Sequence, residues 1–253
     1  MYPHQKVALI PARMGSERVK DKNIYEIDGH PLLAYSVISA IDSNIFDKVV
    51  CVTDSPLYAE IAEHYGACIP SLRPSETSTS TAPDILWVKW ILEELESMGE
   101  KFDIFSILRP TSPLRTPRTI IDAFKQFTED ANADSIRAVQ LCSEHPGKMW
   151  EITGSTMVPF IDKEINGIPW HSNQYKALPK TYIQNASLEF AWTKNIYQNN
   201  SISGKKIIPF ISREYEGFDI NYPQDIYSLE GLIQKNKNLL NKIKTVPFKA
   251  RKK

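Results

Sequence analysis

Residues Ile10–Asn23 read I-P-A-R-M-G-S-E-R-V-K-D-K-N and follow a short apolar strand predicted over Lys6–Leu9. In open α/β sheets, ligands bind beyond the carboxyl ends of the strands, and glycine lets the backbone approach a phosphate closely. The stretch therefore predicts a polyphosphate site, with a solvated basic turn as the alternative. Its spacing matches neither G-x-x-x-x-G-K-[ST] nor G-x-G-x-x-G. The cations that surround Gly15 and Ser16 are Arg13, Arg18, Lys20 and Lys22.

The chain beyond this stretch alternates strand-like and helix-like segments. A β-branched run over Phe46–Thr53 is followed by Ser55 as an N-cap, by Pro56 in a first turn, and by a helix expected to end before Gly66. This alternation predicts an α/β, Rossmann-like fold, in which a mostly parallel sheet carries helices on both faces. Further segments that fit it are the strand Ile104–Leu108 and helix starts at Pro31-Leu32-Leu33, Pro83-Asp84-Ile85 and Thr116-Pro117.

The alternation is lost from about residue 143 to 186, where the pieces are short, rich in proline and glycine, and carry exposed-looking aromatic residues. We expect one domain over residues 1–253, with residues 143–186 as an excursion that caps the site or pairs with another subunit; an ordinary long loop is the alternative. The chain then returns with strands over Ser187–Trp192 and Lys206–Phe210 and a closing helix from Pro223 to about Lys244. The aromatic residues are Trp150, Trp170 and Tyr175.

Composition narrows the class of protein. The 30 basic and 30 acidic side chains cancel, whereas a nucleic-acid binder usually shows a basic excess, so we expect no nucleic-acid partner. The three cysteines are scattered along the sequence, which fits small core residues of a protein in a reducing compartment and not a disulfide framework or a zinc site. No apolar run approaches the roughly 18 residues of a membrane span. We therefore expect a cytoplasmic protein without membrane insertion.

Two further strings join the first in a family resemblance. Residues Leu108–Arg115 read L-R-P-T-S-P-L-R, and residues Phe218–Asp225 read F-D-I-N-Y-P-Q-D. In this order, the three strings resemble motifs of the sugar-acid cytidylyltransferases, which include the CMP-N-acetylneuraminate synthetases. The resemblance covers nearly the whole chain and is weaker from about residue 155 to 200. It implies a Mg²⁺-dependent, homodimeric enzyme that uses CTP and a sugar acid in surface-glycan biosynthesis, with sugar-side and dimer contacts in the excursion.

The resemblance also assigns the polyphosphate residues. Arg13, Ser16 and Lys22 match positions that hold the triphosphate, and Asn23 matches a position that contacts the nucleotide. Lys22 is expected at the α-phosphate, where a positive charge would stabilise the developing negative charge. Lys22, Arg13 and Asp219 form the predicted catalytic set.

Other matches concern the nucleoside and the metal. Arg73 matches an arginine on the base or ribose side, although it could equally serve a structural role, and Ser80 falls in the base-contacting loop. Asp219 is the predicted Mg²⁺ ligand, since this ion prefers carboxylate and phosphate oxygens and retained waters. Asn221 stands where sialic acid enzymes have Asp, and it could face the ion as a neutral ligand. Asp225 is expected to cap the closing helix.

Three positions bear on the acceptor. Arg109 stands where the family commonly has Gln, which predicts an added charge in the pocket. Ile183 falls at or near the position of an arginine that binds the sugar acid, whereas Lys148 matches a sugar-side lysine. Lys148 and Arg109 are therefore expected to meet the acceptor carboxylate.

The predicted function is activation of a nonulosonic acid of the sialic, legionaminic or pseudaminic type by CTP. A synthetase for 3-deoxy-manno-octulosonate and a catalytically weakened nucleotide-binding homologue are the alternatives. A dinucleotide-dependent oxidoreductase is disfavoured, because G-x-G-x-x-G is missing.

Overall fold

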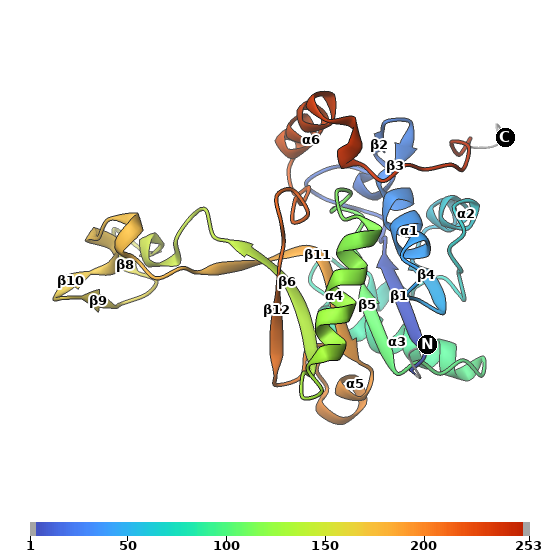
Figure 1. Cartoon of the computed structure of the whole chain (residues 1–253), viewed down its shortest axis with the longest axis horizontal. Helices are drawn as coiled ribbons and strands as arrows, with labels where there is room; N and C mark the ends of the chain where they lie inside the picture. Colours follow the sequence, from blue (N-terminus) through green and yellow to red (C-terminus); the bar gives the residue numbers. More distant parts are fainter. Residues whose placement is uncertain (1–3, 250–253) are drawn as a thin grey trace. The chain divides into compact units, whose positions relative to one another are not determined.

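The computed structural model describes residues 4–249 and is built around one six-stranded sheet, in the order β12-β6-β11-β5-β1-β4 (Figure 1). Strand β1 pairs in parallel with β4 and β5, while β11 pairs with β5 in the antiparallel sense. The parallel part of the sheet confirms the predicted α/β class. The strands are β1 (Lys6–Pro11), β4 (Lys48–Val52), β5 (Ile104–Ile107), β6 (Ser135–Leu141), β11 (Tyr182–Trp192) and β12 (Ile207–Ile211).

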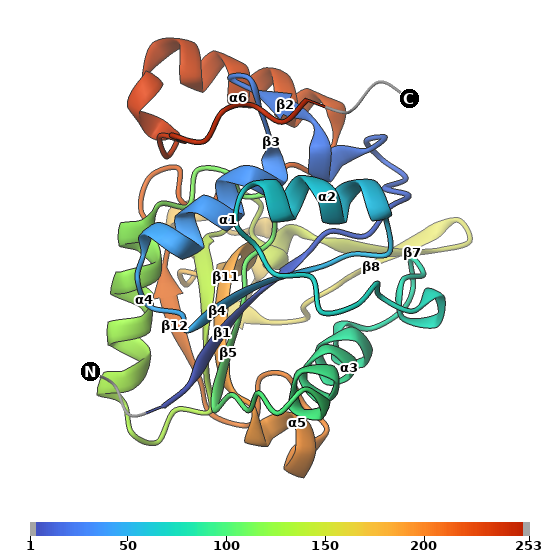
Figure 2. The same cartoon turned by 90° about the vertical axis from the view of Figure 1, so that its right-hand side faces the viewer.

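Helices cover both faces of this sheet, as predicted (Figure 2). Side chains alternate along a strand, so Ala8 and Ile10 of β1 enter one apolar cluster while Val7 and Leu9 enter the other. The first cluster is completed by α1 (Leu32–Asp42), α2 (Pro56–His64) and α4 (Pro117–Glu129), and the second by α3 (Asp84–Ser97) and α5 (Lys194–Asn199). Both faces of β1 are therefore buried, which explains its continuous apolar sequence.

The closing helix is shorter than predicted. Helix α6 spans Pro223–Lys235, and the extension to about Lys244 is wrong. Asn236 leaves the helical conformation with φ −147° and ψ 94°, and its side chain accepts a hydrogen bond from the Asn238 backbone. Asparagine competes for local backbone groups in this way, which favours helix ends over helix interiors. Leu240 reaches the core from the irregular chain beyond the helix.

Residues 139–184 form a second compact unit, while residues 4–138 and 185–249 belong to the first. The second unit begins and ends slightly earlier than the predicted excursion. It is made of short pieces, as expected: β7 (Trp150–Thr153) pairs with β8 (Thr156–Pro159), and β9 (Glu164–Ile165) pairs with β10 (Ile168–Pro169). Its expected contacts with the sugar and with a second subunit stay predictions.

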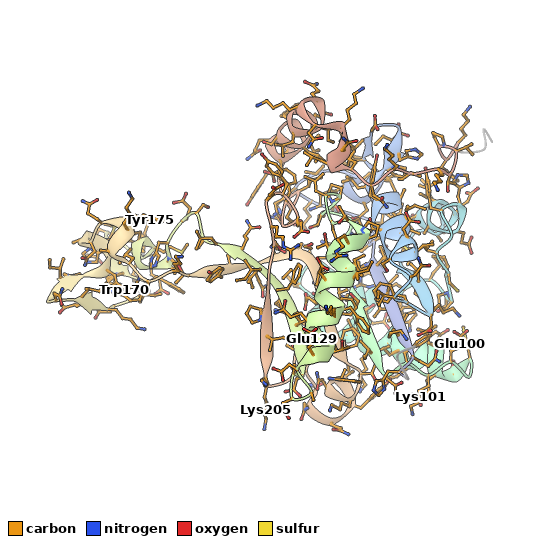
Figure 3. The ribbon with its side chains drawn as sticks, in the orientation of Figure 1. Glu100, Lys101, Glu129, Trp170, Tyr175 and Lys205 are labelled. Carbon is orange, nitrogen blue, oxygen red and sulfur yellow. The ribbon has the colours of Figure 1, made fainter. Side chains whose placement is uncertain are left out.

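The second unit has a small packed core of its own, formed around His145. His145 is buried, contacts the rings of Trp170 and Tyr175 edge-on, and makes a hydrogen bond to the Pro179 carbonyl. A Cβ at Gly147 would lie 2.9 Å from a ring carbon of Trp170, so only glycine fits there. Trp170 is therefore half-buried and not exposed as its sequence context suggested, whereas Trp150 and Tyr175 are exposed. Figure 3 labels Trp170 and Tyr175 within this unit.

Within residues 4–249, no helix combines the length and apolar character that crossing a membrane requires.

Candidate active site

A cavity of about 380 Å³ lies beyond the carboxyl ends of β1 and β5. The chain leaves β1 at Pro11 and β5 at Ile107, and both segments that follow contribute to the cavity wall. The structure therefore brings together, in one wall, all the predicted site residues except Lys148: Arg13, Ser16, Lys22, Asn23, Arg73, Ser80, Arg109, Asp219 and Asn221. Arg18 and Asp84 also line it.

The basic loop after β1 is held by hydrogen bonds from two directions. The buried Asn23 amide donates to the Arg13 carbonyl at 3.1 Å, which fixes the base of the loop. The Met14 amide donates to Asp54 Oδ1 at 2.7 Å, and the Tyr58 hydroxyl donates to Asp21 Oδ1 at 2.9 Å. The loop is thus preorganised before any ligand binds. Asp54 and Tyr58 had no predicted role, since nothing in the local sequence links them to this loop.

Lys22 connects the basic loop to the segment around Asp219. Its half-buried ammonium donates to the Ile220 carbonyl at 2.8 Å. Burial lowers the pKa of Lys22, and the neighbouring cations Arg18 and Arg13 add to the decrease, while Asp219 opposes it. A cation placed in this way can compensate negative charge on a phosphoryl group with little reorganisation.

Asp219 lines the cavity, and one of its two carboxylate oxygens makes no hydrogen bond to the described residues. Its Oδ2 accepts a hydrogen bond from the Asn221 amide at 2.7 Å, while Oδ1 is buried without a hydrogen-bond partner among residues 4–249. The described residues contain no cluster of three or more His, Cys, Asp or Glu side chains that could hold a metal. A single carboxylate with an unused oxygen still fits Mg²⁺, because this ion commonly takes one or two carboxylates, several waters and substrate phosphates.

Asp225 caps α6, as predicted. Its Oδ2 accepts hydrogen bonds from the Asn221 and Tyr222 backbone amides at 2.8 and 2.7 Å. This bond fixes the backbone of Asn221, and Asn221 in turn holds the Asp219 carboxylate. The helix cap thereby orients the predicted metal ligand.

Arg73 is buried and bound within its own loop. Its Nε donates to Thr77 Oγ1 at 3.2 Å, a terminal nitrogen donates to the Thr77 carbonyl, and the guanidinium lies 5.4 Å from the Trp87 ring centre. Burial lowers its pKa to about 10, so it stays charged at neutral pH. Arg73 therefore shapes the loop that presents the exposed Ser80 to the cavity.

Arg109 brings the predicted charge to the cavity wall, but two carboxylates compensate this charge. Its guanidinium lies 2.6 Å from Asp84 Oδ2 and 3.6 Å from Glu189 Oε1. Glu189 also pairs with Arg137, which gives two cations and two carboxylates in one network. One feature of the sequence could have predicted a partner for Arg109: Glu189 is an acidic residue inside the mostly apolar strand S-L-E-F-A-W.

Arg115, which received no role from the sequence, lies fully buried behind the cavity. It donates to Ser36 Oγ at 2.6 Å, to the Arg109 carbonyl at 3.3 Å and to the Ser187 carbonyl. Burial lowers its pKa to about 9. These contacts join the segment after β5 to β11, so Arg115 fixes the backbone from which Arg109 projects.

Lys148 and Ile183 belong to the second unit. The Lys148 ammonium donates to the His171 and Asn173 carbonyls at 3.0 and 2.6 Å, so in this structure it fastens its own unit. Ile183 is exposed on β11. Neither residue lines the cavity described above.

Comparison with known proteins identifies the family of this chain. A family model described as cytidylyltransferase matches residues 7–144. A CMP-N,N'-diacetyllegionaminic acid synthase of Legionella pneumophila is 31% identical over 239 residues, covering 92% of this chain and 98% of the relative. An N-acylneuraminate cytidylyltransferase of Escherichia coli is 28% identical over 232 residues, covering 92% of this chain and 52% of the relative.

Among solved structures, a CMP:2-keto-3-deoxy-manno-octonic acid synthetase complexed with CTP superposes with a TM-score of 0.65. It is 13% identical and covers 91% of this chain and 99% of its own, so it supports the fold alone. The family match, by contrast, includes the basic loop, Arg73 and the whole L-R-P-T-S-P-L-R segment. The chain belongs to the cytidylyltransferase family.

Proposed function

We propose that this protein is a Mg²⁺-dependent cytidylyltransferase that couples CTP to a nonulosonic acid and releases pyrophosphate. The observation that carries the proposal is the charge distribution of the cavity. Arg13, Arg18 and Lys22 line it together with Asp219, whose buried Oδ1 has no partner within residues 4–249. This arrangement suits a triphosphate accompanied by a divalent cation.

In the proposed reaction, the anomeric hydroxyl of the sugar acid attacks the α-phosphorus of CTP. A bond forms between the sugar oxygen and this phosphorus, the bond to the bridging oxygen breaks, and pyrophosphate leaves with the electron pair while the hydroxyl proton is released. Lys22 and Arg13 bind and orient the phosphates, and their charges match the negative charge that grows on the phosphoryl oxygens. Bound Mg²⁺, held by Asp219 and hydrated beside Asn221, would neutralise phosphate charge.

The acceptor class rests on the sequence relatives. The relatives reported above are named for legionaminic and N-acylneuraminic acids, and one of them matches nearly end to end. The alternative acceptor, 3-deoxy-manno-octulosonate, is supported only by the shared fold. We propose a nonulosonic acid, with sugar-side and dimer contacts supplied by the second unit, which exposes large apolar side chains such as Ile152 and Phe160.

The test is pyrophosphate release by the full-length protein. Each of CTP, UTP, ATP and GTP is combined with N-acetylneuraminic, diacetyllegionaminic and pseudaminic acids and with 3-deoxy-manno-octulosonate, with and without Mg²⁺. We expect turnover with CTP and at least one nonulosonic acid, only when the metal is present. Turnover with the octulosonate alone would overturn the acceptor class, and no pyrophosphate in any combination would favour the weakened homologue.

A further inference from the structure

We propose that Asp84 contacts the substrate and reads hydrogen-bond donors of the nucleoside, either the exocyclic amine of the base or the ribose hydroxyls. The inference rests on the proposed function and adds Asp84 to the residues that would contact the nucleotide. Asp84 stands at the first position of α3, and its side chain lines the cavity. A carboxylate in the wall of a polyphosphate site repels the phosphates, so its presence there calls for a role other than phosphate binding.

The carboxylate is held in place from two sides. Trp87 Nε1 donates to Asp84 Oδ1 at 2.8 Å, and Arg109 donates to Oδ2 at 2.6 Å. Each oxygen of a carboxylate can accept two hydrogen bonds, so each keeps one acceptor position beyond these bonds. About 39% of the side chain is exposed, which leaves those positions accessible to a ligand in the cavity.

Asp84 is also held in the ionised form. Burial by itself would raise the pKa of Asp84, but the Arg109 charge and the bonds from Trp87 and Arg109 outweigh it and lower the pKa below its usual value. An ionised carboxylate only accepts hydrogen bonds. A ligand group that contacts Asp84 must therefore be a donor.

Charged side chains of both signs line the cavity. Lys22, Arg18 and Arg13 outnumber Asp219, and this excess of positive charge suits phosphates. The Asp84 carboxylate instead forms an ion pair with Arg109, which reduces the positive charge available beside it. Phosphates bound by the first group would leave the uncharged nucleoside of the same nucleotide to contact Asp84. In cytidine, the donors available there are the exocyclic amine and the ribose hydroxyls.

The experiment measures binding in the absence of sugar acid, so that no turnover occurs. Dissociation constants of CTP, UTP, 2′-deoxy-CTP and 3′-deoxy-CTP are determined by calorimetry for the wild type and for Asp84→Asn. Two matched variants accompany it. Glu189→Gln removes the other carboxylate beside Arg109, and Glu189 does not line the cavity. The double variant Asp84→Asn/Arg109→Gln replaces the ion pair by neutral groups.

We expect the wild type to prefer CTP over at least one analogue, and Asp84→Asn to reduce that preference roughly tenfold or more, as for one charge-assisted hydrogen bond. Loss of the CTP-over-UTP ratio would identify the base amine, and loss of a ratio to a deoxy analogue would identify a ribose hydroxyl. Glu189→Gln should keep the wild-type ratios of dissociation constants. The double variant should be as non-selective among the four nucleotides as Asp84→Asn, and it provides the test if Asp84→Asn does not fold.

Three results would overturn the inference. One is a wild type that binds CTP and all three analogues equally, and another is a set of ratios that Asp84→Asn leaves unchanged. The third is a double variant that recovers wild-type selectivity, because Asp84 would then serve only to neutralise Arg109. Failure of the proposed function looks different: the wild type would bind no CTP, or would release no pyrophosphate with any sugar acid.

Discussion

Replacing Arg109 by glutamine, the residue that the family resemblance leads one to expect at this position, should destabilise this protein. Arg109 makes a charge-assisted hydrogen bond to Asp84, and such bonds contribute about 1.5–3 kcal/mol. The two side chains are 28% and 39% exposed, so solvent screening brings the expected loss to about 1–2 kcal/mol. For a chain of 253 residues, this corresponds to a decrease in Tm of about 2–8 °C.

The loss should depend on pH in a defined direction. In the wild type, the lowered pKa of Asp84 means that its ionised form stabilises the fold above the unfolded value of about 3.9, and that this stability is lost as the pH falls through the folded pKa. In Arg109→Gln, burial remains but the cation is gone, so the pKa of Asp84 should rise. The difference in unfolding free energy between wild type and variant should therefore be largest near pH 7 and should shrink toward pH 4.

Urea denaturation followed by circular dichroism at pH 7 and pH 4 measures this difference. The matched control is Asp84→Asn/Arg109→Gln, which has no carboxylate at position 84 and should show a much weaker pH dependence relative to the wild type than Arg109→Gln alone does. A loss of equal size at both pH values, or no loss at pH 7, would refute the ion-pair argument.

Three other outcomes are expected. Lys22→Met should fold normally and lower kcat by about 10²-fold, because one preorganised charge at the phosphates is lost; pyrophosphate release with saturating CTP measures it, and an unchanged kcat would remove Lys22 from the site. Asp219→Asn should abolish turnover at modest Mg²⁺, whereas Asn221→Asp should lower the Mg²⁺ needed for half-maximal rate; metal titrations decide both. Arg115→Met should lower the unfolding free energy by about 2–5 kcal/mol, measured by urea denaturation, since buried acceptors lose their donor.

The elements that the sequence predicted best are those with local signals. Ser55 caps α2 and accepts from the Tyr58 amide, and Thr116 and Thr119 cap each other at the start of α4, so both helix starts can be read within four residues. The end of α6 was missed although Asn236 marks it locally, because the apolar spacing continues through Leu240 where the chain is no longer helical. Apolar spacing reports burial, and burial does not require a helix.

The cavity wall was predictable for a related reason. Arg13 follows β1 and Arg109 follows β5, and the ends of neighbouring parallel strands meet at one edge of a sheet. The supporting residues were not predictable in this way. Asp54 holds the basic loop from 40 positions away, and Arg115 reaches Ser187 across 72 positions, so these pairs become visible only once the chain is folded.

Arg109 illustrates how such distant pairs change the meaning of a motif. Compared within the L-R-P-T-S-P-L-R string alone, arginine in place of glutamine adds a charge, and the natural inference is a new contact with an anionic substrate. The fold supplies Asp84 from α3 and Glu189 from β11, which compensate that charge before any substrate arrives. Arg109→Gln therefore does more than remove one charge from the pocket, since it leaves the Asp84 carboxylate without its cation. The position acts as one member of a network, and Asp84 is the member that lines the cavity with acceptor positions still open to a ligand.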